Sequence, residues 1–381
     1  MHRFLALLFA GLLAGSTGPL ITTIAGLTGM AIAPNPSLAT VPATIIVMAI
    51  TIATIPLALI TQRLGRKTVL VAGAIVGSVS CLACATAISA GSFLLLVVAA
   101  VGVGVASAVN LSYKFAIAAV AGEKRFTQAH AVALLIGLVS GLIGPFLALR
   151  YVGFSAHNYQ GSFIAAAVLY AIAVPFLLVI RIPPAQPRAV KQSAPAQPWT
   201  VNEKRAVLGM AFCSSTMSMT MTSAPLAAGI LSMSNHELGI VMQLHFVAMF
   251  VPAILGVALA KRFGLYSMLI LGFVLNGGAI TLGFPAHDFN LALWCLILSG
   301  CSWSIVSLVT AIAVSKSQNP RVEGLFNLTT ALATAVGTLA AGIIMDIVGW
   351  TGVLLASAML TVLFSAFAIL VGRTAADPEL A

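Results

Sequence analysis

The sequence predicts an all-α membrane protein of twelve transmembrane helices, arranged as two pseudo-symmetric six-helix bundles. Three observations lead to this fold class: the composition, the recurrence of long apolar runs, and the placement of Lys and Arg. Of the 381 residues, 60% are hydrophobic and 7% are charged, and the mean hydropathy is +1.11. Soluble domains carry about 25% charged residues. The composition therefore excludes an ordinary cytosolic enzyme, a disordered chain and a nucleic-acid binder.

Apolar runs of the length needed to cross a bilayer recur along the whole chain. About 20 helical residues span the roughly 30 Å of hydrocarbon, and only helices or closed barrels satisfy their backbone polar groups there. The short alternating strands of a barrel are absent from the sequence. The expected helices lie near 4–27, 40–60, 68–90, 93–117, 128–149, 160–180, 205–230, 238–260, 265–284, 289–314, 324–345 and 350–371.

The net charge of +10 reflects membrane topology rather than a phosphate-binding surface. If the N-terminus is cytoplasmic, sixteen of the eighteen Lys and Arg residues fall in cytoplasmic segments. Arg150 lies on the other side, and Lys114 lies within the span 93–117. Cytoplasmic loops of membrane proteins are enriched in these residues. We therefore expect a multi-pass protein of the bacterial inner membrane with both termini in the cytoplasm.

A polar, proline-containing stretch divides the chain into halves. It predicts an N-terminal six-helix bundle over 1–181, a cytoplasmic linker over 182–204 and a C-terminal six-helix bundle over 205–381. The linker contains Pro183, Pro184, Pro187, Pro195 and Pro198.

Local repeats support the division into related halves. The segments 16–20 and 222–226 share the order hydroxyl, hydroxyl, small, Pro, Leu, at an offset of 206 residues. Glycines after polar turns repeat as well: Gly65 pairs with Gly264 at an offset of 199, and Gly153 with Gly349 at 196. Such repeats are typical of secondary transporters.

The loop after the second expected helix carries a motif that resembles the signature of the major facilitator superfamily. That signature reads Gly-x-x-x-Asp-Arg-x-Gly-Arg-Arg/Lys. Ala58 replaces its first glycine and Gln62 its aspartate. The resemblance covers nearly the whole chain and implies a transporter that works by alternating access. It implies a role at the cytoplasmic gate for the residues that fit the motif or its second-half copy, namely Arg63, Gly65, Arg66, Lys67, Arg262 and Gly264.

A second motif points to a branch of the same family. The run Gly137-x-x-x-Gly141-x-x-Gly144-Pro145 resembles in part the glycine-rich motif of drug antiporters. The buried arginine of that branch is replaced by Val98. Other segments resemble bacterial members known mainly as transporters, some of which take up riboflavin.

Titratable groups at membrane depth are few, and the acids lie near the membrane faces. Lys114 is expensive to bury, which favours a role in substrate binding or gating, although its long side chain could instead reach the interface. His245 could carry a coupling proton or simply pack between helices. The full set of candidate substrate-binding residues is Ser16, Thr17, Asn110, Tyr113, Lys114, Ser218, Thr222, Gln243, His245, Trp303 and Asn327.

Two substrate classes fit these residues. Efflux of lipophilic, drug-like compounds is favoured by Trp303 and by the adaptable run Met217, Met219 and Met221. Transport of a neutral or anionic metabolite, for example a flavin-type vitamin, is favoured by cations without buried acids. A non-transporting membrane receptor or assembly factor on the same fold is a third alternative. We expect a monomer that binds a small molecule and is not an enzyme, with no cofactor, metal site or nucleic-acid partner.

Overall fold

The computed structural model describes residues 2–121, 126–183, 199–317 and 320–373, which form helices joined by short turns. Its contacts divide the chain into two compact units, Met1–Arg188 with Asn235–Gln243, and Ala189–Ser234 with Leu244–Ala381. Most of the expected linker, residues 184–198, lies outside the described residues.

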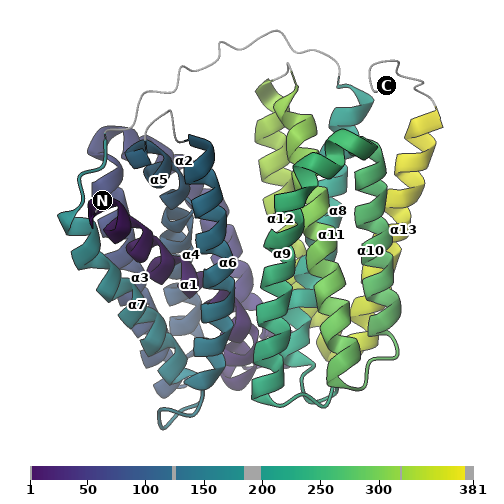
Figure 1. The fold of residues 1–381 in the computed structure, drawn as a ribbon. Coiled ribbons are helices and arrows are strands. Elements are labelled where there is room, and N and C mark those ends of the chain that lie inside the picture. The colour runs from purple at the N-terminus through teal and green to yellow at the C-terminus, as the bar shows by residue number, and fades with distance from the viewer. Residues whose placement is uncertain (1, 122–125, 184–198, 318–319, 374–381) are drawn as a thin grey trace. The chain divides into compact units, whose positions relative to one another are not determined.

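The N-terminal bundle, α1 to α7, follows the expected order of spans (Figure 1). Its elements are α1 (His2–Ile32), η1 (Pro36–Leu38), α2 (Val41–Leu64), α3 (Arg66–Ser89), α4 (Phe93–Asn110), α5 (Tyr113–Ala121), α6 (Phe126–Arg150) and α7 (Gln160–Val179). Within it, α1 packs on α6 and α7, while α3 packs on α4 and α7.

The C-terminal bundle, α8 to α13, repeats these pairings. Its elements are α8 (Val201–Leu226), α9 (Asn235–Phe263), α10 (Leu265–Gly283), α11 (Phe289–Ser315), α12 (Pro320–Ile347) and α13 (Gly349–Arg373). Here α8 packs on α12 and α13, and α10 packs on α11 and α13. The pairs match those of the first bundle when α8 is equated with α1 and α10 with α3.

Ten segments among the described residues are long and apolar enough to cross a membrane. In this count η1 and α2 together form one segment, and α4 and α5 together form another. The helices α8 and α9, of 26 and 29 residues, complete a set of twelve. The hydropathy of α8 is low because residues 202–205 in its first turn are polar or charged and its core-facing residues include many Ser and Thr side chains. The expected fold class is therefore confirmed.

The expected helix 93–117 is broken, which is a correction to the sequence prediction. The chain makes a tight turn in which Ser112 N–H donates to Val109 O at 2.8 Å, and α5 then begins at Tyr113. This backbone bond reaches three residues back rather than four, so the regular α-helical pattern is interrupted here. Lys114 therefore lies in the first turn of a separate short helix.

Two glycine turns give the repeat a backbone signature. Gly65 joins α2 to α3 with φ 82° and ψ 153°, and Gly264 joins α9 to α10 with φ 80° and ψ 156°. These dihedral angles belong to a region that only glycine occupies without strain. The other pair is less alike, since Gly349 joins α12 directly to α13 whereas residues 151–159 separate α6 from α7.

Close helix packing repeats at the same offset of 199 residues. A methyl group placed on Gly73 of α3 would lie 2.5 Å from Val109 Cγ1 of α4. One placed on Gly272 of α10 would lie 2.5 Å from Val306 Cγ2 of α11. In both bundles, the missing side chain lets a valine pack against the helix backbone, as is common in membrane bundles.

We expect Gly65→Ala and Gly264→Ala each to lower the unfolding free energy by about 1–3 kcal/mol, the usual cost of a residue forced into this backbone region. A methyl group at either position would meet nothing within 4 Å, so the whole effect would come from the backbone. Thermal unfolding in detergent measures it. Gly277→Ala is the control because it also has open space but lies inside α10. Equal melting temperatures for all three variants would contradict the backbone argument.

Candidate functional site

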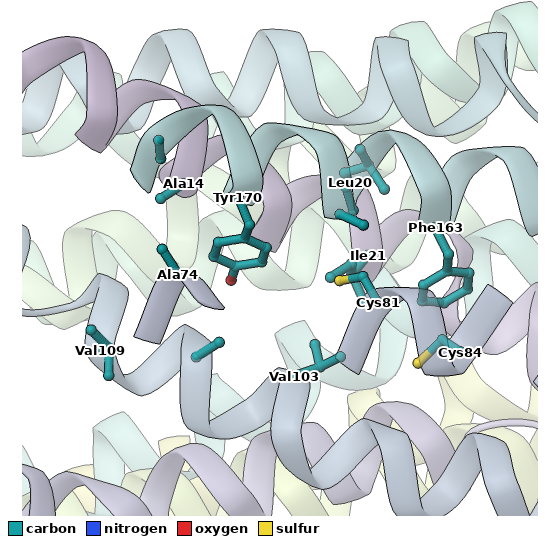
Figure 2. Packing of buried hydrophobic residues seen from close by; sticks show 14 of the residues in the cluster. Ala14, Leu20, Ile21, Ala74, Cys81, Cys84, Val103, Val109, Phe163 and Tyr170 are labelled. Carbon is teal, nitrogen blue, oxygen red and sulfur yellow. The ribbon is translucent and has the colours of Figure 1, made fainter. Parts of the chain in front are cut away.

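A polar contact joins three helices inside the N-terminal bundle. Asn110 of α4 donates from Nδ2 to Ala14 O of α1 at 2.9 Å and to the hydroxyl of Tyr170 at 3.0 Å. Thr17 also donates to Ala14 O at 2.7 Å. Figure 2 shows Tyr170 projecting from α7 into the buried cluster, with its ring near Ala14 and Ala74. The expected residues Thr17 and Asn110 thus meet at one carbonyl of α1.

The proline of α1 lies directly beyond this contact. Pro19 has no N–H, so the carbonyl four residues earlier loses its helical donor. Ser16 is buried and donates to Leu12 O at 2.8 Å. Ser140 of α6 donates to the same carbonyl at 3.4 Å. Carbonyl groups of α1 thus accept hydrogen bonds from α4 at Ala14 and from α6 at Leu12.

Tyr113 and Lys114, neighbours at the start of α5, have opposite surroundings. Tyr113 is buried against α1, where a methyl group on Gly11 would lie 3.1 Å from its ring, and its hydroxyl has no partner. Lys114 is exposed, with Nζ 5.1 Å from the centroid of the Phe115 ring. The cation is therefore accessible at this end of the bundle rather than locked into the core.

In the C-terminal bundle, hydroxyl groups of α8 form a row of contacts with the helices around it. Trp303 of α11 donates from Nε1 to Ser214 Oγ at 3.2 Å, which fixes its half-buried indole. Thr220 Oγ1 lies 3.3 Å from Ser299 Oγ of α11. Ser218 donates to Thr334 O of α12 at 3.2 Å. This row places α8 in the same role that α1 has in the first bundle.

A buried amide of α10 joins the same row. Asn276 donates from Nδ2 to Thr361 Oγ1 of α13 at 2.8 Å and to Thr216 Oγ1 of α8 at 3.4 Å. It is the counterpart, at an offset of 199, of Gly77 in α3, where a methyl group would lie 2.7 Å from Tyr170. In the C-terminal bundle the amide of Asn276 thus joins α10 to α8 and α13. In the N-terminal bundle Tyr170 of α7 packs against α3 and bonds to α4.

His245 of α9 is fully buried and has one hydrogen bond. Its Nδ1 lies 2.7 Å from Leu296 O of α11, and its Nε2 has no partner. A carbonyl only accepts, so Nδ1 carries the proton and Nε2 is an acceptor in the neutral ring. Gln243 lies two residues earlier on α9, and Thr222 is buried on α8. Asn327 is exposed on α12.

The basic residues expected at the gate lie at the two glycine turns. Lys67 donates from Nζ to Leu178 O at 2.5 Å, so it caps the last turn of α7. Arg63 is exposed, and Arg66 begins α3. Arg262 is exposed and lies over the Phe263 ring at 5.4 Å. One of these cations is thus bound to the bundle, whereas Arg63 and Arg262 remain accessible.

Sequence reasoning missed several residues of these contacts. Tyr170 has the largest role among them, since it is fully buried and binds Asn110. Its signal was a phenol in the middle of an apolar run, which needs a partner for its hydroxyl. The others are Ser140, Ser214, Thr216, Ser299 and Thr361.

The twelve long helices, the repeated pairings and the polar contacts of α1 and α8 define a multi-pass helical membrane transporter. Comparison with known families agrees with this class. The pattern of the Major Facilitator Superfamily matches residues 3–216 and again 206–380. The chain belongs to this family.

Two similar proteins illustrate the range of its relatives. The riboflavin transporter RfnT of Brucella anthropi is 26% identical over 329 residues, which cover 85% of this chain and 83% of RfnT. An uncharacterised MFS-type transporter of Bacillus subtilis, YddS, is 26% identical over 327 residues, covering 79% and 75%. These relatives are transporters rather than enzymes.

Solved structures share the fold at low sequence identity. A bacterial homologue of the lysosomal transporter Spinster aligns with a TM-score of 0.74 at 15% identity, over 98% of this chain and 96% of that one. The nucleoside transporter NupG aligns with a TM-score of 0.73 at 14% identity, over 98% and 100%. At this level of sequence identity, these structures show only that the chain shares their fold.

Proposed function

We propose that this protein carries riboflavin, or a metabolite with the same kind of ring, across the bacterial inner membrane. The observation that carries the proposal is the similarity to RfnT over 85% of this chain. It favours the metabolite alternative of the sequence analysis over drug efflux. Both termini would be cytoplasmic, as the distribution of Lys and Arg predicts.

The side chains suit a neutral, polar aromatic cargo. Riboflavin combines a flat, hydrogen-bonding ring system with a polyhydroxyl chain. Trp303 offers a flat surface for stacking, and its orientation is fixed by the bond to Ser214. Serine and threonine side chains of α1 and α8 supply hydroxyl groups. The described helices carry Asp and Glu only near their ends, which suits a cargo without positive charge.

Alternating access supplies the mechanism. The two bundles would move as units, so that the cargo becomes accessible first from one side of the membrane and then from the other. The exposed cations Lys114, Arg63 and Arg262 would act at the cytoplasmic opening. His245 is the group proposed to take up a coupling proton at Nε2, in a state of the cycle that hydrates its ring, because burial in the described state disfavours the charged form. The transporter would work as a monomer.

Efflux of lipophilic compounds is the second candidate. It is favoured by the run of methionines on α8, where Met221 is half-buried beside the buried Met217 and Met219. Methionine adapts its shape to different apolar ligands.

We expect proteoliposomes containing the protein to move riboflavin saturably, and Trp303→Ala to weaken its apparent affinity about 5- to 150-fold. That range corresponds to about 1–3 kcal/mol for a ring stacked on an aromatic side chain. Riboflavin fluorescence, measured with vesicles loaded on either side, reports flux and direction. Trp294→Ala is the matched control because Trp294 lies on the same helix but is 54% exposed.

The outcome decides between the two candidates. Protein-dependent movement of a neutral lipophilic dye without any riboflavin flux would reject the flavin proposal in favour of efflux. Saturable transport of a quaternary amine would contradict the preference for uncharged or anionic cargo. Equal losses of apparent affinity in the two tryptophan variants would show that Trp303 does not contact the cargo. They would not bear on which compound is transported.

A further inference from the structure

The N-terminal bundle carries an apolar groove that the transport mechanism does not use. It has a volume of about 610 Å³ and lies between the first half of α1, the first half of α6 and the end of α7. Its walls include Leu5, Phe9, Leu12, Leu135, Val139 and Phe176.

Helix packing explains why the groove is there. Farther along α1, the helix meets α6 closely, because a methyl group on Gly144 would lie 2.7 Å from Ser16 O and from Leu20 N. One turn earlier, a methyl group on Gly15 would lie 2.8 Å from Ser140 Oγ. Between Leu5 and Leu12, large apolar side chains of both helices line the groove instead.

The third wall is aromatic. The rings of Phe9 and Phe176 meet edge to face, with centroids 4.9 Å apart and planes at 68°. This pair joins α1 to α7 along one side of the groove. The rim stays open, since Leu5, Phe9 and Leu135 are 53%, 44% and 53% exposed.

We propose that this groove holds one acyl chain of a membrane phospholipid. All three helices are long and apolar enough to cross the membrane, so the open rim faces hydrocarbon or protein rather than bulk water. All the side chains that line the groove are apolar, which suits a hydrocarbon chain and not the hydroxyl-rich cargo proposed above. An empty groove would forfeit the dispersion contacts of its walls, and a flexible chain restores them.

The position of the groove along α1 explains why the acyl chain would be retained. The groove begins at Leu5, close to the start of the span Phe4–Ile32, so a chain that entered there would keep its headgroup near the membrane surface. Contact on three helices distinguishes it from lipid that touches a single helix face. The acyl chain therefore acts as a wedge that holds α1 and α6 apart at this end.

Native mass spectrometry of the protein purified in mild detergent tests the proposal. We expect one phospholipid to be retained per chain, and Ala6→Phe, which fills the groove from α1, to lower that occupancy at least tenfold. Leu94→Phe is the matched control, since Leu94 is an apolar side chain of α4 that is 74% exposed and lies outside the groove. Equal occupancy in the three proteins would overturn the proposal.

Photolabelling gives a second test that does not depend on the variant folding. A phosphatidylethanolamine with a photoreactive acyl chain should label segments 5–12 and 132–139 several times more than the α2 face at Ile52 and Ile55, which are 67% and 72% exposed. Equal labelling of the groove segments and of the α2 face would show that the groove binds lipid no better than the rest of the surface, and would overturn the proposal. Displacement of the label by riboflavin would make the groove part of the cargo path and would also overturn the proposal. Unchanged labelling in a protein that fails to move riboflavin would leave the lipid site standing.

Discussion

Tyr170→Ala is expected to lower the unfolding free energy of the N-terminal bundle by about 3 kcal/mol. Replacing a buried large aromatic residue with alanine costs about 3–5 kcal/mol in soluble proteins. The low end applies here because lipid, rather than water, is the alternative surrounding for the ring. Tyr170 is fully buried, and its ring fills the space left by the missing side chain of Gly77 on α3. Thermal unfolding in detergent measures the loss.

A second substitution separates the ring from its hydroxyl. Tyr170→Phe keeps the packing but removes the acceptor for Asn110 Nδ2, which still donates to Ala14 O. Interhelical hydrogen bonds in membranes average about 0.6 kcal/mol. We therefore expect Tyr170→Phe to melt close to the unmodified protein. Equal destabilisation by both variants would show that the hydroxyl, and not the ring, holds α7 in place.

Gly144→Val is expected to lower stability by at least the roughly 1–3 kcal/mol that overpacking a core costs. The first added carbon alone would lie 2.7 Å from Ser16 O, from Leu20 N and from Pro19 Cβ. Two of these atoms belong to the backbone of α1, so no rotamer change can make room. The helices α1 and α6 would have to separate at the proline, and transport should fall together with stability.

The control for this substitution lies on α1 itself. Gly18→Ala places a methyl group in open space, with nothing within 4 Å. It should keep the melting temperature and the transport rate. The equivalent contact of the C-terminal bundle is Gly337 of α12, where a methyl group would lie 2.5 Å from Ser215 O of α8. A tolerated Gly144→Val would show that the α1–α6 crossing is not as close as the structure describes.

Much of the fold could be predicted from the sequence because the bilayer imposes simple rules. Length and apolarity locate a span, and the missing water forces it to be helical. Gly65 and Gly264 were found as a pair, and both have the backbone dihedral angles that demand glycine. The turn at Leu111 and Ser112 was missed, since the apolar pattern continues across it without interruption.

The candidate site was only partly predictable. Polar residues at depth stand out in an apolar sequence, and this drew attention to Thr17, Asn110, Ser218 and Trp303. Their partners are hidden, because a carbonyl such as Ala14 O has no signature in the side-chain sequence. Tyr170 was overlooked for a related reason, since an aromatic side chain in an apolar helix is usually just packing.

The sequence by itself determined the class of this protein, its number of spans and its two-fold repeat, because hydropathy and periodicity are local properties of the chain. The tertiary structure alone decided which polar groups meet, as when Asn110, Ala14 and Tyr170 join α4, α1 and α7. It alone also revealed the groove beside Leu5 and Phe9. Such contacts depend on how far apart and at what angle helices pack, and glycines distant in sequence set those quantities by the side chains that they lack.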